Sequence, residues 1–146
     1  MSFYKDGASV RLANYSELFR DPQFWQSLRI TLLYVLLYTL GVFFVGFFTA
    51  LVVHNAEQTH TKGSGIWGTI IMIPYAIPDV VASLIWFVMF DFKFGVLNYF
   101  LSLFGITPLK YLLNPGIALY SVLIATIWRL FPLHCMIFLA AFRAVP

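Results

Sequence analysis

The chain has 146 residues, of which 61% are hydrophobic, 19% aromatic and only 10% charged. A soluble domain carries about 25% charged residues, and a globule of this length leaves much of its chain in contact with water. The composition therefore excludes a soluble enzyme, a disordered tail and a disulfide scaffold. The net charge of +3 comes from scattered Lys and Arg residues without a basic run, so no nucleic-acid partner is expected.

Three long apolar stretches predict an all-α, polytopic integral membrane protein with one transmembrane domain over residues 1–146. Residues 30–53 carry no charge and exceed the roughly 20 residues that a helix needs to cross a bilayer. Residues 66–90 and 117–142 contain prolines and charges. They are still predicted to span, because neighbouring helices can satisfy the backbone groups that proline frees. The lipid bilayer is therefore the expected surroundings of most of the chain.

Prolines inside the second and third stretches predict helix kinks. Pro74 and Pro78 are four residues apart and so share one face of the second predicted helix, and Pro132 lies within the third. Transporters often place a kinked or unwound segment beside a substrate site. A kink that serves only packing explains the same pattern, so both interpretations stay open.

Two shorter helices are predicted at the membrane surface. Asn14 is expected to begin the first, with Glu17 placed to complete a capping box, and Asp21-Pro22 to begin the first span. Between the second and third stretches, apolar residues at helical spacing predict an amphipathic helix that Gly105 ends. This helix is too short to cross the bilayer and is expected in the interface. Its apolar residues are Leu97, Phe100, Leu101 and Phe104.

Two charged residues within the spans are the first candidates for a functional role, because a charge inside a membrane is costly unless it is paired or wetted. Asp79 lies about 13 residues into the second stretch, and Arg129 lies about 12 residues into the antiparallel third. Both are therefore expected at similar depth near the bilayer midplane. A structural ion pair, the lining of a polar translocation path and a proton relay are all compatible with this placement.

The other candidates for a substrate path flank these two charges. Ser83 and Trp86 lie four and seven residues beyond Asp79 and extend one polar and aromatic face of the second helix. Tyr75 and Trp128 join them by depth and polarity. For Trp86 the alternative is membrane anchoring, which is the more frequent role of a tryptophan near an interface.

Small residues at four-residue spacing predict close helix packing, at Gly46 with Ala50 and at Ser121 with Ala125. The single cysteine, Cys135, is expected to be a small buried side chain.

No catalytic or metal-binding motif is found along the sequence. His54, Glu57 and His60 lie in a short polar link, which is expected to be a solvated loop rather than a metal site. No phosphate-binding glycine-rich loop is present, so an ATP-driven role requires an ATPase on another polypeptide, and no cofactor is expected in this chain.

Several motifs follow one another along the chain. NYSELFRDPQFWQSL at residues 14–28 comes first, then IPYAIPDVV at residues 73–81 and LAAFRAVP at residues 139–146. Three shorter motifs lie between the second and the third: Gly95-Val96-Leu97-Asn98, Asn114-Pro115 and Trp128-Arg129. In order and spacing the set resembles the permeases of binding-protein-dependent ABC transporters, in the carbohydrate, maltose-type subfamily.

The resemblance implies a permease subunit of an ATP-driven sugar importer in the inner or plasma membrane. It implies a second permease subunit, ATPase subunits that bind the ATP, and an external solute-binding protein as partners. Residues 94–114 would face the binding protein, and residues 54–65 would be cytoplasmic. The first helix of the family and its EAA loop, which docks on the ATPase, are expected to lie outside this partial chain.

Two other functions stay open from the sequence. One is a small non-transporting membrane protein, or a truncated remnant, that packs against partner helices. The other is a proton-coupled transporter that uses Asp79 and Arg129. Orientation is open too, because six positive charges lie on the side that the resemblance makes external and two on the other, contrary to the positive-inside rule.

Overall fold

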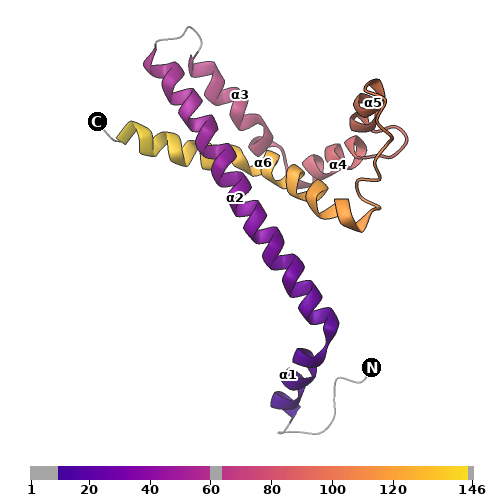
Figure 1. Ribbon diagram of the computed structural model, residues 1–146. Coiled ribbons are helices and arrows are strands. Elements are labelled where there is room, and N and C mark those ends of the chain that lie inside the picture. The colour runs from indigo at the N-terminus through magenta and orange to yellow at the C-terminus, as the bar shows by residue number, and fades with distance from the viewer. Residues whose placement is uncertain (1–9, 60–63, 145–146) are drawn as a thin grey trace. The chain divides into compact units, whose positions relative to one another are not determined.

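The computed structural model describes residues 10–59 and 64–144, and within these residues the regular structure is entirely helical. The helices follow in chain order (Figure 1): α1 (Val10–Arg20), α2 (Pro22–Gln58), α3 (Ser64–Ala76), α4 (Asp79–Met89), α5 (Val96–Leu103) and α6 (Pro115–Ala144). Two compact units, Met1–Leu36 and Leu37–Pro146, divide the chain within α2. The predicted all-α class is confirmed.

Two of the described helices are long and apolar enough to cross a membrane, α2 with 37 residues and α6 with 30. Helices α3 and α4 pass the same test only as a pair, and they meet at an angle of 88°. The structure thus has two candidate spans, or three if the bent pair is one span. The predicted stretches 30–53 and 117–142 lie inside α2 and α6, which continue beyond them at both ends.

The first unit holds α1 and the beginning of α2. Helix α1 begins at Val10, so the predicted start at Asn14 is wrong: residues 10–13 already have helical backbone. The predicted start of α2 is confirmed, because Oδ1 of Asp21 accepts a hydrogen bond from the N–H of Gln23 at 2.8 Å. The indole N–H of Trp25 donates to the carbonyl of Phe19 at 2.8 Å and joins the two helices at this turn.

The core of the second unit lies where α2, α3 and α6 meet (Figure 1). Gly46 of α2 is buried, and a Cβ atom added there would lie only 2.8 Å from Cβ of His134 on α6. The two helix backbones therefore approach closely, as small residues permit. One turn further along, four buried residues of α2 and α6 pack together with Ile71 of α3, which confirms the predicted packing role of Ala50 and the buried position of Cys135. The four are Ala50, Val53, Cys135 and Leu139.

An ion pair that the sequence analysis did not predict joins the ends of α2 and α6. Nη2 of Arg143 lies 2.5 Å from Oε1 of Glu57, and Nε of Arg143 donates to Oε2 at 3.1 Å. Because α2 continues to Gln58, His54 and Glu57 lie in a helix, and the predicted solvated loop from His54 onward is wrong. No helix breaker interrupts the polar residues after the apolar stretch. His60 lies outside the described residues.

The turn between α4 and α5 is fixed by Asp91. Its Oδ1 accepts hydrogen bonds from the N–H groups of Lys93 at 2.8 Å and Phe94 at 2.7 Å. These two bonds, the Phe94 bond first, hold the pKa of Asp91 below its usual value of 3.8.

We expect the turn to lose this support only in strong acid. Because the folded state lowers the pKa of Asp91, the carboxylate stabilises the turn above the unfolded-state value of 3.8, and this contribution is lost as pH falls through the lower folded-state pKa. The amide NMR shifts of Lys93 and Phe94 should titrate together with a midpoint below 3.8, and Asp91→Asn should remove the titration. A midpoint at or above 3.8 would contradict the hydrogen-bond assignment.

Helix α5 is held by the buried side chain of Asn98, which is 4% exposed. Its Nδ2 donates to the carbonyl of Leu109 at 3.0 Å, and its Oδ1 accepts from the N–H of Leu109 at 2.9 Å. The Nδ2 of Asn98 also donates longer hydrogen bonds to the backbone carbonyls of Asp91 and Phe92. Gly105, with a φ of +70°, ends the helix as predicted, in a conformation that glycine adopts without strain.

Asn98→Ala should release the segment that contains Leu109. Leaving these partly buried backbone groups unpaired costs up to about 1–3 kcal/mol, so hydrogen exchange at the Leu109 amide should accelerate roughly five-fold or more. Ser102→Ala is the matched control, because this exposed hydroxyl on the same helix bonds only the nearby carbonyl of Tyr99. Equal exchange at Leu109 in both variants would show that Asn98 does not hold the segment.

Candidate functional site between α4 and α6

The break between α3 and α4 places Asp79 at the beginning of α4. Residues Ile77 and Pro78 leave the helical conformation, and Pro78 has a ψ of 144° at the position just before the helix. Proline lacks a backbone N–H and disfavours helical geometry in the residue before it. Pro74 lies inside α3, two residues before its end, and Pro132 is buried inside α6, where a kink stays a prediction.

An ion pair joins α4 to α6, between the two charges that the sequence places at similar depth. Nη2 of Arg129 lies 2.5 Å from Oδ1 of Asp79. Arg129 is the fifteenth of the 30 residues in α6, and so it lies at the midpoint of a candidate span. Its side chain is 22% exposed, whereas that of Asp79 is 77% exposed. The carboxylate of Asp79 is therefore accessible from outside the α4–α6 pair.

A cavity of about 510 Å³ opens beside this ion pair. Its polar end is formed by Asp79, Ser83 and Arg129, and its aromatic wall by Trp86 and Phe90. The Trp86 ring packs against Phe90 with a centroid distance of 5.1 Å. A volume of this size suits a small-molecule ligand that meets an apolar wall and a few polar groups.

Two buried donors in the cavity wall have no hydrogen-bond partner in the described part of the chain: Nε of Arg129 and Nε1 of Trp86. Buried donors are normally paired, and an unpaired one calls for an explanation such as a ligand or water. Both are N–H groups, so a partner would have to be a hydrogen-bond acceptor. The site therefore combines two unpaired donors with a carboxylate and an aromatic wall.

Four of the six predicted path residues line this cavity: Asp79, Ser83, Trp86 and Arg129. Trp128 does not line the cavity, but its ring packs against that of Trp86, with a centroid distance of 5.6 Å. Tyr75 lies on α3, before the bend, and is not part of this cavity. The structure therefore does not bring Tyr75 together with the others, and its role in a path stays a prediction.

Apart from Arg129, the part of the wall that α6 supplies was not predicted from the sequence. Val122, Ala125 and Thr126 line the cavity together with Arg129. They precede Arg129 by seven, four and three residues, which is the spacing of one helix face. Phe90 follows Trp86 by four residues in the same way, so extending both faces by helical periodicity would have found these residues. Among the described residues, no group of three or more His, Cys, Asp or Glu side chains could hold a metal ion.

Curated proteins align with nearly the whole chain. A "Probable ABC transporter permease protein" of Pyrococcus horikoshii is 35% identical over 139 residues, which is 94% of this chain. The chain is homologous to part of an ABC transporter permease. The "sn-glycerol-3-phosphate transport system permease protein UgpA" of Agrobacterium fabrum is 31% identical over 139 residues. The "Trehalose/maltose transport system permease protein MalF" of Thermococcus litoralis is 27% identical over 146 residues.

These alignments confirm the resemblance that the motif order indicated. The chain spans about half the length of the curated relatives it matches, between 45% and 48% of the three named above. No protein-family profile matches the chain.

A solved structure has the same fold. It is the crystal structure of a bacterial alginate ABC transporter in complex with an alginate pentasaccharide-bound periplasmic protein. The match has a TM-score of 0.74 and 21% identity, and it covers 90% of this chain and 45% of that one. This permease homologue therefore shares the fold of a solved ABC transporter chain over 90% of its length.

Proposed function

We propose that this permease homologue forms part of the translocation path of an ATP-driven ABC importer in the inner or plasma membrane, and that its substrate is a neutral sugar. The observation that carries the proposal is the α4–α6 cavity, in which an ion pair at the midpoint of a span adjoins an aromatic wall. The relatives are ABC transporter permeases, one of which is named for trehalose and maltose.

The chemistry of the cavity favours a sugar. Sugar hydroxyls accept and donate hydrogen bonds, and the C–H faces of a pyranose ring pack on aromatic rings. Arg129 and Trp86 each offer an unpaired N–H, and Asp79 offers carboxylate oxygens as acceptors. Since the ion pair leaves no net charge, an added phosphate would have to compete with Asp79 for Arg129. The pair therefore favours a neutral ligand over an anionic one.

The proposed mechanism is alternating access. A second permease subunit would complete the path, an external solute-binding protein would deliver the sugar, and separate ATPase subunits would bind and hydrolyse ATP. We assign no catalytic step and no cofactor to this chain. Its own contribution is the ion pair, which holds α4 against α6, and the break at Ile77 and Pro78, which lets α4 move without bending a continuous helix.

Uptake measurements in right-side-out membrane vesicles test the proposal. Vesicles from cells with and without the gene are resupplied with the soluble periplasmic proteins of the same cells. They then receive radiolabelled maltose, trehalose or sn-glycerol 3-phosphate, with or without internal ATP and a protonophore. We expect gene-dependent uptake of a neutral sugar that needs ATP and survives the protonophore. Uptake that needs only the proton gradient would establish the proton-coupled alternative. A preference for sn-glycerol 3-phosphate would overturn the substrate class, and gene-independent uptake would favour a non-transporting protein.

Trp86→Phe isolates one of the proposed sugar contacts, because it removes the unpaired N–H and keeps an aromatic wall. A typical hydrogen bond contributes about 0.5–1.5 kcal/mol, so the KM for the sugar should rise roughly 2- to 10-fold with little change in maximal uptake. Trp67→Phe is the matched control, because Trp67 is an exposed residue of α3 outside the cavity. An unchanged KM in Trp86→Phe would remove this residue from the proposed site.

A further inference from the structure

One face of α5 is uncovered and almost entirely apolar. Asn98 points inward and fixes the rotation of the helix, so the residues on the opposite side face outward. These residues, the outer face of α5, are between 41% and 79% exposed in the chain. They are Val96, Tyr99, Phe100, Leu103 and Phe104.

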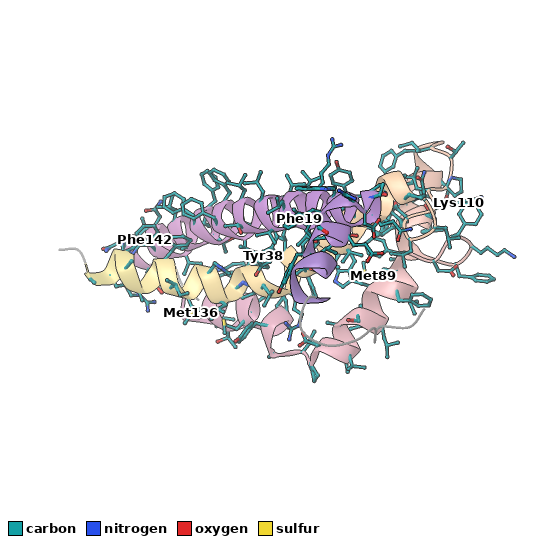
Figure 2. All side chains as sticks on the ribbon, turned by 90° about the horizontal axis from the view of Figure 1, so that it is seen from below. Phe19, Tyr38, Met89, Lys110, Met136 and Phe142 are labelled. Carbon is teal, nitrogen blue, oxygen red and sulfur yellow. The ribbon has the colours of Figure 1, made fainter. Side chains whose placement is uncertain are left out.

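The segment that carries α5 is tied to the start of a membrane span. The ring of Tyr111 packs on Phe90 at the end of α4, with a centroid distance of 5.1 Å. The hydroxyl of Ser121, in the second turn of α6, donates to the carbonyl of Tyr111 at 3.2 Å. Figure 2 shows Lys110 at the end of the second unit opposite Phe142, near the other end of α6. If α6 crosses the membrane, this segment lies at the N-terminal end of the span.

The segment carries a net positive charge. Between residues 91 and 114 the acidic residue is Asp91, and its Oδ1 is occupied by the N–H groups of the turn. The basic residues are Lys93 and Lys110, and the ammonium of Lys110 lies 5.6 Å from the ring centroid of Phe92. Lysines beside exposed aromatic rings are typical of the headgroup layer of a bilayer, where rings enter the interface and ammonium groups meet phosphates.

We propose that the outer face of α5 inserts into the lipid headgroup layer beside the N-terminal end of α6, with Lys93 and Lys110 on the phosphates of anionic lipids. The occupant of this face is thus the bilayer and not a soluble protein. Attachment to a span supports this choice, because it holds the face at the membrane surface at all times. The amphipathic helix then anchors the end of α4, and with it the cavity wall at Phe90, to the membrane surface.

Spin labels in the full chain test the insertion, in vesicles of phosphatidylcholine with 30% or no phosphatidylglycerol. Cysteines are introduced at Phe100 or Phe104 on the outer face, and at Ser102 as the matched control, in a Cys135→Ala background. Collision rates with oxygen and with a water-soluble nickel chelate give the depth of each label. We expect the labels at 100 and 104 to lie below the phosphates and the label at 102 to lie in water. Raising the phosphatidylglycerol content should lower nickel access at 100 and 104 at least two-fold.

The lysines are tested by the pair Lys93→Gln and Lys110→Gln. With both changes, the dependence of depth on phosphatidylglycerol should disappear while the labels stay in the interface. Labels at 100 and 104 that are as open to nickel as the label at 102, in every lipid, would overturn the proposal. So would nickel access that falls only when a soluble binding protein is added, because the face would then be a protein-docking surface.

Discussion

Asp79→Ala is expected to reduce uptake at least ten-fold, because it leaves the Arg129 guanidinium unpaired at the midpoint of a span. Translocon-insertion scales put an arginine at the helix centre at about 2.5–3.5 kcal/mol. In the native chain Asp79 offsets part of this cost and holds α4 against α6. Without the Asp79 carboxylate, α6 should either insert poorly into the membrane or let the Arg129 side chain turn toward water. In both cases α4 and α6 are no longer held together, and the cavity between them opens. Uptake of radiolabelled sugar, normalised to the amount of protein in the membrane, measures the effect.

The partner of Asp79 provides the control. Arg129→Ala alone should also reduce uptake, and Asp79→Ala with Arg129→Ala should restore membrane insertion, because no unpaired charge remains. The double variant should still transport poorly, since both polar groups of the cavity are gone. Such non-additive behaviour is expected for residues in direct contact. Glu57→Gln, which breaks the other ion pair away from the cavity, should leave uptake closer to the native level. Normal insertion and normal uptake in Asp79→Ala would show that the pair has no role.

Gly46→Leu should strongly lower the stability of the α2–α6 packing. Even a Cβ atom at this position would lie 2.8 Å from Cβ of His134 and 3.1 Å from the backbone nitrogen of Cys135. A helix backbone cannot yield as a flexible side chain can, so α2 and α6 must separate. Overpacking of this kind costs about 1–3 kcal/mol, and the separation also opens the core around Ala50. The thermal midpoint in detergent should fall by several degrees, with a smaller fall for Gly46→Ala.

Gly68 offers a matched control on another helix. A Cβ atom added there meets no other atom within 4 Å, so Gly68→Leu should leave the midpoint nearly unchanged. Equal midpoints for the two leucine variants would contradict the close approach of α2 and α6.

Periodicity and hydropathy predicted the parts of the fold that depend on local sequence. The helices at residues 30–53 and 117–142, the cap at Asp21 and the short helix before Gly105 are confirmed, because each is set by neighbouring residues. The predicted apolar face of the short helix is divided: Phe100 and Phe104 are exposed, whereas Leu97 and Leu101 are partly buried. The sequence also singled out Asp79 and Arg129 together, and the structure pairs them. The depth estimate assumed one continuous second helix, whereas the structure breaks that stretch just before Asp79. These predictions needed no knowledge of how the helices cross.

The way in which the helices bend and pack could not be predicted from the sequence. Three prolines suggested kinks, but the 88° bend lies at Ile77 and Pro78, while α3 continues past Pro74. That bend separates Tyr75 from the cavity, although Tyr75 is only four residues from Asp79. The bonds from Asn98 to Leu109 and from Arg143 to Glu57 join residues far apart along the chain, so no local pattern revealed them.

Cysteine protection tests the central claim, that the α4–α6 cavity is part of a sugar path, most directly. Ser83→Cys, in a Cys135→Ala background of the assembled transporter, places a thiol in the cavity, and Val80→Cys places one on α4 outside it. Each is treated with a water-soluble methanethiosulfonate reagent with and without maltose or trehalose. We predict modification at position 83 that the transported sugar slows several-fold during ATP-driven turnover, and no effect of sugar at position 80. A thiol at position 83 that the reagent does not reach, or that sugar does not protect, would contradict the account.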